Sequence, residues 1–257
     1  MTAPVLVTGS AGRLGRAAVA ALLEAGVSVR GFDRRPTPGL PGAAVAELTD
    51  AVAVREAARG TRCVIHLAAA PDDARYPRGD APDDGDNFLS ELVPANVVGL
   101  YHVLEACRTE GVPRVVLASS GQVVAGQFHD NALPATVTAL PTPRYLYACT
   151  KVLMEAMGGV YARNHGLEVL SVRLGWCPRD AGQVAEIAAA PDFQDVYLSP
   201  ADAGSFFERA ANAAWRGHHV VYVTSRHLRR LCYDLAPTAR LLGWSPREGW
   251  PTGADAF

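Results

Sequence analysis

The sequence contains almost no lysine. All but one of its 24 lysine and arginine residues are arginine, and the exception is Lys151. Tyr147 precedes it by four positions, a spacing that puts two side chains on one face of a helix. With 8 tyrosines among 257 residues, chance places a tyrosine there roughly 3 % of the time (8/257). A chain that uses arginine everywhere else therefore keeps a lysine where its chemistry is needed.

Other features are also missing. The net charge is only −2, which gives no reason to expect nucleic acid or an anionic membrane as a partner. The five cysteines form no C-x-x-C pair, so neither a zinc site nor a disulfide framework is indicated. No apolar run reaches the roughly 18 residues of a membrane span, and no signal-peptide pattern follows Met1. We therefore expect a cytoplasmic protein that binds a small molecule and no metal.

Short apolar runs alternate with helical patterns, which is typical of a parallel sheet covered on both faces. The expected strands are residues 4–9, 27–33, 63–69, 112–120, 167–175 and 218–225. The expected helices are residues 13–26, 50–60, 93–111, 145–166 and 201–217. The tail from residue 226 looks irregular, apart from one helical turn near Leu241. These patterns predict an α/β fold, a Rossmann-type doubly wound parallel sheet with a small C-terminal substrate-binding region.

Two stretches interrupt this alternation. Residues 71–88 are rich in Asp, Pro and Gly and lack the spacing of a calcium loop, so we expect a surface lid or linker. Residues 176–200 are weakly periodic and are expected to fold over a ligand. We place the cofactor and catalytic residues in 1–175. Residues 176–257 are expected to form a substrate-binding region that completes the same domain.

The segment "TGSAGRLG" carries Gly9, Gly12 and Gly15 between a predicted strand and a predicted helix. Glycines allow the main chain to approach a pyrophosphate, whose charge is favourable at a helix N-terminus. Asp33 ends the next predicted strand, where a carboxylate accepts hydrogen bonds from an adenosine ribose. A tight turn alone would explain the glycines, but the strand, the helix and Asp33 together favour a dinucleotide site.

The residues around Asp33 bear on the choice of dinucleotide. Asp33 repels a 2′-phosphate and therefore favours NAD. Arg34 and Arg35 follow it directly, and an arginine at this place can hold the 2′-phosphate of NADP. The two arginines are also explained as a solvated loop. We expect NAD, with NADP as the alternative.

The chemistry of Tyr147 explains why its neighbour is a lysine. A phenol has a pKa of about 10, too high for an effective base at neutral pH. A nearby ammonium favours the phenolate, and its rotatable donors also serve ribose hydroxyls, which the planar fork of arginine fits poorly. Ser119 and Ser120 end a predicted strand at the crevice where such sheets bind ligands. A hydroxyl there can hold a substrate oxygen for Tyr147.

The motifs follow one another as "TGSAGRLG", Asp33, "HLAAA", "ANVVGLYHVLEA", "ASSGQV" and "YACTK". In this order they resemble the extended short-chain dehydrogenase/reductases, the NAD-dependent epimerase/dehydratase family. The resemblance implies that Ser120 positions the substrate, that Tyr147 is the general acid/base, and that Lys151 supports Tyr147 and binds ribose. Besides Tyr147 and Lys151, the implied cofactor-binding residues are Gly9, Ala11, Gly12, Arg13, Leu14, Asp33, Arg34, Glu47, Leu48, Ala68, Ala69, Asn96, Gly175 and Cys177.

Within this family the chain most resembles the short uronate dehydrogenases, through "VRLGWCP", "DFQDVYLSPAD" and "LGWSPRE". It departs from them after the catalytic serine, where Gly121 and Gln122 replace Asn-His, and at Trp176, which replaces a small serine. No arginine matches the clamp for a substrate carboxylate, and Arg179, the nearest, is off position. We therefore expect a flatter, ring-shaped substrate with a polar handle. Its expected contacts are Ser120, Gly121, Gln122, Tyr147 and Trp176.

The resemblance implies an NAD(P)-dependent oxidoreductase that interconverts a secondary alcohol and a ketone on a small polar or ring-shaped substrate. The alternative is a sugar or sugar-nucleotide epimerase or dehydratase with tightly bound NAD, although such relatives usually carry a larger C-terminal region. A cofactor sensor without activity is a third reading, opposed by the retained Tyr147 and Lys151. The resemblance also implies a homodimer through helices 93–110 and 144–164, although both helices could be buried within one chain.

Overall fold

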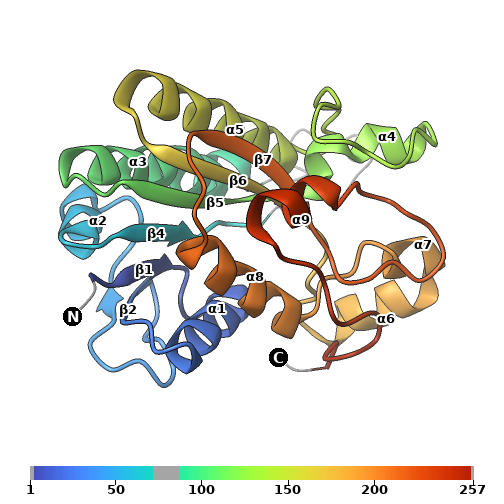
Figure 1. Ribbon diagram of the computed structural model, residues 1–257, viewed down its shortest axis with the longest axis horizontal. Coiled ribbons are helices and arrows are strands. Elements are labelled where there is room, and N and C mark those ends of the chain that lie inside the picture. Colours follow the sequence, from blue (N-terminus) through green and yellow to red (C-terminus); the bar gives the residue numbers. More distant parts are fainter. Residues whose placement is uncertain (1–2, 72–86, 256–257) are drawn as a thin grey trace.

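The computed structural model describes residues 3–71 and 87–255. Within them, seven parallel strands form one sheet in the order β3-β2-β1-β4-β5-β6-β7 (Figure 1). The strands are β1 (Val5–Thr8), β2 (Val29–Asp33), β3 (Ala44–Val45), β4 (Cys63–His66), β5 (Arg114–Ser120), β6 (Glu168–Leu174) and β7 (His218–Val223). Strands β1, β4 and β6 are buried along their whole length, because helices cover both faces of their apolar runs. The predicted doubly wound, Rossmann-type parallel sheet is confirmed.

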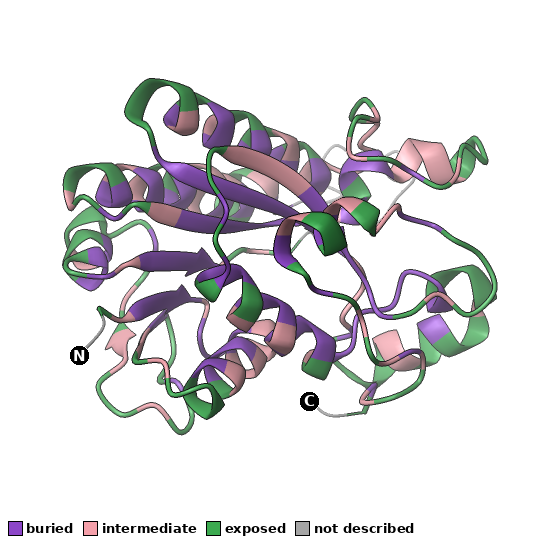
Figure 2. Cartoon of the chain, viewed as in Figure 1, coloured by how far each residue is buried: buried purple, intermediate pink, exposed green. Residues whose placement is uncertain are grey.

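Helices lie on both sides of the sheet, and Figure 2 shows that their outer faces are exposed while the central strands are buried; β2, β3 and β7 are only partly buried. The helices are α1 (Arg13–Glu24), α2 (Ala51–Ala58), η1 (Phe88–Val98), α3 (Gly99–Thr109), η2 (Gly121–Val124), α4 (Ala125–His129), α5 (Leu146–His165), α6 (Ala181–Ala189), α7 (Pro191–Gln194), α8 (Pro200–Asn212) and α9 (Ala236–Leu242). On one side α1 and α8 bury Leu22 and Phe206 in a shared core. On the other side α2, α3 and α5 bury Val54, Leu104 and Met154.

The predicted helix 93–111 begins earlier than expected and changes type along its length. Residues Phe88–Val98 form the π-helix η1, which runs directly into α3. Pro94 lies inside η1, and its carbonyl accepts the N–H of Gly99, five residues on. The apolar pattern predicts only the later part, because proline is usual at the first turn of a helix and rare inside one.

Short elements are the ones that the sequence did not predict. They are the edge strand β3 and the helices η2, α4 and α7, of two to five residues each. Each has too few residues for a periodic pattern to stand out. The nine-residue α6 was also not predicted, because its segment is only weakly periodic. The predicted turn near Leu241 is α9. Of the predicted lid or linker at 71–88, residues 72–86 lie outside the described residues.

The C-terminal tail is more ordered than the predicted irregular segment. Two buried carboxylates hold its main chain. Asp195 accepts hydrogen bonds from the N–H groups of residues 228–230, and Asp202 accepts them from residues 247 and 248. A buried carboxylate needs such partners, because water no longer solvates it. The sequence does not reveal this order, since the donors are main-chain groups far along the chain.

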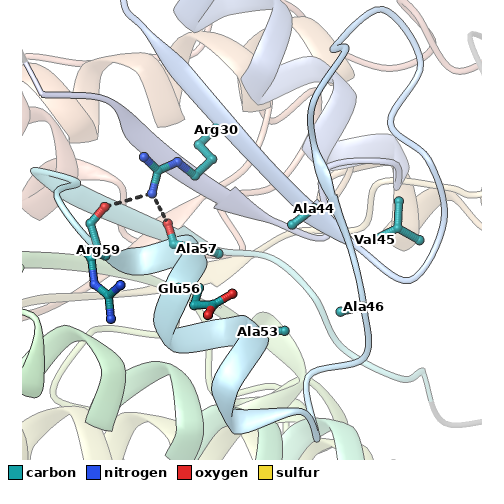
Figure 3. Close-up of a pocket in the computed structure, with 8 residues that line it drawn as sticks. All are labelled: Arg30, Ala44, Val45, Ala46, Ala53, Glu56, Ala57 and Arg59. Carbon is teal, nitrogen blue, oxygen red and sulfur yellow. Dashed lines mark hydrogen bonds between the residues drawn. The ribbon is translucent and has the colours of Figure 1, made fainter.

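A hollow of about 410 Å³ lies between β2, β3 and α2 (Figure 3). Four of its eight lining residues are alanine. Arg30 donates hydrogen bonds to the carbonyls of Ala57 (2.6 Å) and Arg59 (2.8 Å) at the C-terminal end of α2. Carbonyls at a helix C-terminus have no partner within the helix, and a cation there is favourable. This arginine therefore completes a helix end, and the hollow has a structural explanation.

Candidate active site

A cavity of about 920 Å³ lies at the carboxyl ends of the central strands. This is the edge at which open parallel sheets bind ligands. The lining contains these predicted residues: Gly9, Gly12, Arg13, Leu14, Ala69, Ser120, Gly121, Gln122, Tyr147, Lys151, Gly175, Trp176 and Cys177. The structure thus brings most of the predicted cofactor, catalytic and substrate residues around one space.

The glycine-rich segment 9–15, which we call the phosphate loop, needs its glycines because the main chain is tightly packed there. Gly9 has a φ of +72°, and a Cβ on it would lie 2.6 Å from the main-chain nitrogen of Ala68. A Cβ on Gly15 would lie 2.0 Å from the carbonyl oxygen of Gly9. No side chain caps the N-terminus of α1, and Gly12 and Leu14 line the cavity there. Main-chain N–H groups at an uncapped helix start suit the diphosphate of a dinucleotide.

Asp33 fastens this loop to the end of β2. Its carboxylate accepts hydrogen bonds from the N–H groups of Ala11 (3.0 Å) and Arg35 (2.9 Å). The residue is buried. A carboxylate has about four acceptor positions, so two remain for ribose hydroxyls. The loop and Asp33 therefore fit an NAD molecule bound along the sheet edge.

Arg13 lies in the phosphate loop but also reaches the other end of the chain. Its Nη2 donates hydrogen bonds to the carbonyls of Gly253 (2.8 Å) and Ala254 (3.1 Å). The predicted contact of Arg13 with the cofactor stays a prediction. What the structure adds is a direct tie between the phosphate loop and the C-terminal tail.

Asn96 was predicted to bind the cofactor and takes a position behind the cavity lining. Its side-chain amide bonds to the N–H (2.8 Å) and the carbonyl (2.9 Å) of Ala70, and it also donates to Thr150 (3.3 Å). Asn96 thereby joins the segment after β4 to α5, the helix that carries Tyr147. It positions the lining from behind, and its cofactor contact stays a prediction.

Five further predicted cofactor residues are not among the lining residues of the cavity: Ala11, Arg34, Glu47, Leu48 and Ala68. Arg34 and Glu47 are exposed. Leu48 is buried in the core against Gly99, whose absent Cβ would lie 2.6 Å from it. Their contact with an adenine or a ribose stays a prediction.

The structure separates the roles of the two serines that end β5. Ser119 is buried, and its hydroxyl donates to Glu155 at 2.6 Å. Ser120 is partly exposed to the cavity, and its hydroxyl oxygen accepts the N–H of Gln122 at 3.1 Å. The proton of Ser120 can therefore point to a ligand. Ser119 also touches the cavity, but its hydroxyl proton is already donated to Glu155.

Tyr147 and Lys151 lie one turn apart at the start of α5. The Nζ of Lys151 is 5.2 Å from the centre of the Tyr147 ring, and it donates to the carbonyl of Ala118 at 2.9 Å. Burial lowers the pKa of Lys151 to about 7. Burial also raises the pKa of Tyr147 to about 12, and the positive charge of Arg179 opposes that rise. Arg179, which also lines the cavity, is thus a cation that acts on the phenol.

The segment after β6 forms one wall of the cavity, as its weak periodicity led us to expect. Trp176 meets Phe193 edge to face, with ring centres 5.2 Å apart, and both line the cavity. The indole N–H donates to Gln183 at 3.3 Å, which connects this ring to α6. The wall combines aromatic surface with polar groups, a surface suited to a sugar ring.

Several lining residues were not predicted. They come from η2–α4, from the start of α5 and from the tail: Phe128, His129, Leu133, Arg144, Arg230 and Tyr233. Their segments carry no repeat or motif, and they reach the cavity only through long-range contacts. An aromatic residue in an apparently irregular tail was the one available signal, since an exposed tail rarely needs one.

The Rossmann-type sheet, the glycine loop and the Tyr147–Lys151 pair define a nicotinamide-dependent oxidoreductase. A family model described as "NAD dependent epimerase/dehydratase family" matches residues 5–176, and the chain belongs to this family. It is an enzyme that acts on a CH–OH group with NAD or NADP as its cofactor. The predicted family, enzyme class and cofactor are confirmed.

Relatives of known activity match the chain over nearly its full length. The L-arabinose 1-dehydrogenase (NAD(P)(+)) of Haloferax volcanii is 31 % identical, over 97 % of this chain and 98 % of the relative. The NAD-dependent glucose-6-phosphate dehydrogenase of the same organism is 29 % identical, over 96 % of this chain and 94 % of the relative. The crystal structure of glucuronic acid dehydrogenase from Chromohalobacter salexigens is 25 % identical and superposes with a TM-score of 0.77, over 98 % of this chain and 86 % of that one.

No helix in the described parts of the chain is both long and apolar enough to cross a membrane. Within residues 3–71 and 87–255, no group of three or more His, Cys, Asp or Glu side chains is arranged to hold a metal ion.

Proposed function

We propose that the protein oxidises a free aldose at its anomeric carbon, giving a lactone, with NAD as the preferred cofactor. The observation that carries this proposal is that Ser120, Tyr147 and Lys151 converge on one cavity in a chain that matches a sugar 1-dehydrogenase over 97 % of its length. The phosphate loop shares this cavity, so the substrate has only part of its 920 Å³. A single sugar ring suits that space.

The proposed roles follow from the geometry. The hydroxyl of Ser120 donates to the anomeric oxygen, and Tyr147 takes the proton of that oxygen. Lys151 and Arg179 supply the positive charge that favours the phenolate. Bound NAD supplies the hydride acceptor, so that the anomeric carbon loses a hydride as its oxygen loses a proton and the C=O bond of the lactone forms.

We further propose that NAD is held by the main chain of Gly12–Leu14 and by Asp33. Asp33 faces the loop from the end of β2, where its charge favours a ribose 2′-hydroxyl over a 2′-phosphate. Arg34 is exposed directly after it and is the residue that could hold NADP. Ala69, Gly175 and Cys177 line the cavity and are proposed to enclose the nicotinamide end: these three come from the segments after β4 and β6.

The choice of aldose is proposed to depend on the wall opposite the phosphate loop. Gln122 and Trp176 line it, and three exposed arginines, Arg144, Arg179 and Arg230, line the same cavity. Acidic aldoses therefore belong among the candidates, although Glu186 and Asp192 also line the cavity and offset this charge.

The proposal is tested by following the reduced nicotinamide absorbance with NAD and a panel of aldoses. The panel includes pentoses, hexoses, their phosphates, uronates and UDP-glucose. We expect turnover with at least one free aldose, a lactone product identified by NMR, and no turnover by Tyr147→Phe. An epimerised sugar without net reduction of NAD would instead establish the epimerase alternative.

Assembly, location and internal organisation complete the proposal. We propose a homodimer in which η1, α3 and α5 of two copies meet, because Tyr101, Leu153 and Val160 leave apolar surface exposed there. A molecular mass measured by light scattering tests this.

The five free cysteines fit a cytoplasmic location. Residues 1–175 are proposed to carry the cofactor and catalytic groups, and 176–257 the substrate-binding region of the same domain.

A further inference from the structure

Tyr233, in the tail between β7 and α9, occupies the space beside Gly121. A Cβ added to Gly121 would lie 2.2 Å from the hydroxyl oxygen of Tyr233 and 2.7 Å from its Cζ. Contacts this short do not occur between real atoms, so the ring takes the place of a side chain at residue 121. Gly121 directly follows Ser120, and both line the cavity together with Tyr233. The phenol hydroxyl therefore lies beside the residue that directly follows Ser120, the serine proposed to hold the anomeric oxygen.

The ring of Tyr233 packs against two other aromatic rings. It stacks on Tyr222 with ring centres 4.6 Å apart and an angle of 12°, and Phe128 meets it edge to face at 5.3 Å. Its main chain is fixed as well, because the N–H of Ala135 donates to Cys232 and the N–H of Asp234 donates to Ala135. A side chain confined in this way presents its hydroxyl at a fixed point.

A buried ion pair anchors the stacking partner. The hydroxyl of Tyr222 accepts a hydrogen bond from Arg173 at 2.8 Å. Arg173 makes two hydrogen bonds to Glu155, at 2.9 and 2.8 Å, and Glu155 accepts the hydroxyl of Ser119 at 2.6 Å. This Ser119–Glu155–Arg173–Tyr222 network joins β5, α5, β6 and β7. Ser120 lies on β5 and Tyr147 lies on α5. The network therefore fixes the position of Tyr233 relative to both residues.

The hydroxyl of Tyr233 makes no hydrogen bond to any group in the described parts of the chain. The residue is only 4 % exposed, and it lines the cavity. Burial raises the pKa of Tyr233 above its ordinary range, and the phenol stays protonated at working pH. A protonated hydroxyl that lines a cavity without a protein partner is available as a donor to a ligand.

We propose that Tyr233 is a substrate-binding residue that donates a hydrogen bond to the sugar hydroxyl adjacent to the anomeric carbon. Gly121 is glycine because this phenol fills the position of its side chain. The inference rests on the proposed function, since it needs a substrate with a hydroxyl beside the reacting carbon. Tyr233 thus supplies from the tail a polar contact that Gly121, having no side chain, does not provide.

The test compares Tyr233→Phe with Tyr161→Phe on two substrates. Tyr161 bonds to Glu105, does not line the cavity, and serves as the matched control. The substrates are an aldose that the wild-type protein oxidises and its 2-deoxy analogue. We expect Tyr233→Phe to lower kcat/KM for the full aldose by about 10- to 100-fold. For the 2-deoxy analogue we expect Tyr233→Phe and wild type to differ by less than about threefold, and the affinity for NAD to be unchanged.

Equal losses on both substrates, or no loss on either, would overturn the role of the hydroxyl. Failure of the wild-type protein to oxidise any aldose would overturn the proposed function instead, and this inference with it. The two failures are distinguished by the wild-type assay alone.

A second pair of variants tests the steric part of the proposal. We expect Gly121→Ala to lower kcat/KM by at least about tenfold, because the new methyl group overlaps the phenol. In a Tyr233→Leu background, where the ring is gone, the same change is expected to cost less than about threefold. Should Tyr233→Leu not fold, Gly121→Ala is judged alone in the wild-type chain. Full activity of Gly121→Ala, or equal losses in both backgrounds, would contradict the inference.

Discussion

The two ends of the cavity are built differently. The phosphate end consists of one short segment, Gly9 to Gly15, which lines the cavity and is hydrogen-bonded to Asp33. The substrate end consists of side chains from four distant segments, among them Ser120, Tyr147 and Trp176, and the tail residue Tyr233. A main-chain site depends on glycines and a helix start, whereas a side-chain site depends on every contact that orients its members. The difference implies that binding of the cofactor and recognition of the sugar can be changed separately.

Loss of the Tyr147 phenol is expected to have the largest effect on activity. It also gives the clearest test of whether the two ends of the cavity act independently. Tyr147→Phe removes the proton acceptor and leaves the phosphate loop intact. We expect kcat to fall by about 10²- to 10⁴-fold with no change in the dissociation constant for NAD. Rates come from nicotinamide absorbance and affinity from fluorescence titration. A parallel loss of NAD affinity would show that the two ends are not separable.

Breaking the buried ion pair is expected to have the next largest effect. Arg173→Met leaves the carboxylate of Glu155 buried without its partner, which costs about 3–5 kcal/mol of unfolding free energy. The double variant Arg173→Met/Glu155→Leu removes both charges and is expected to recover most of that loss. Denaturant unfolding measures both. A loss below about 1 kcal/mol for the single variant would mean that the substrate end does not depend on this pair.

Asp33 provides the corresponding test at the cofactor end. Asp33→Ala removes the acceptor for ribose hydroxyls, and we expect NAD affinity to fall by about tenfold. NADP affinity is expected to fall less, because the repulsion of its 2′-phosphate is also removed. Asp50→Ala, which removes the N-cap of α2, is the control. A changed KM for the sugar at saturating NAD would contradict the independence of the two ends.

A further expected effect concerns the pH dependence of stability. Burial lowers the pKa of Lys151 from 10.5 to about 7, so between these values the unfolded chain binds a proton that the folded protein has lost. Stability therefore rises with pH across that window, and the rise belongs to Lys151. We expect the unfolding free energy of the wild-type protein, without cofactor, to increase relative to Lys151→Met from about pH 7 to about pH 10. Parallel pH profiles for the two proteins would contradict this.

The parts of the molecule that the sequence predicted are those encoded locally. The alternation of apolar runs gave the sheet and the long helices, because each element is long enough to show its own period. The phosphate loop and the pair Tyr147 and Lys151 were predictable for the same reason, since their spacing is fixed within one turn or one helix. Even here the start of η1 was not predicted, because Pro94 suggested the first turn of a helix and in fact lies inside one.

The parts that escaped prediction depend on contacts between distant residues. Tyr233 follows Gly121 by more than a hundred positions, and nothing in "LCYDLAP" shows that its ring returns to the end of β5. The choice between Ser119 and Ser120 depends on Glu155, which lies on another element. The order of the tail depends on carboxylates that bind main-chain groups, a pairing with no sequence pattern.

The overlap between position 121 and the phenol of Tyr233 has a consequence for evolution and for protein engineering. A larger side chain at position 121 would overlap the ring of Tyr233. We therefore expect the two positions to change together. Chains that carry a larger residue after the serine are expected to carry a smaller one at the tail position. An effort to alter sugar preference by grafting only the segment after Ser120 is therefore expected to yield inactive protein, whereas a graft that moves both segments retains activity.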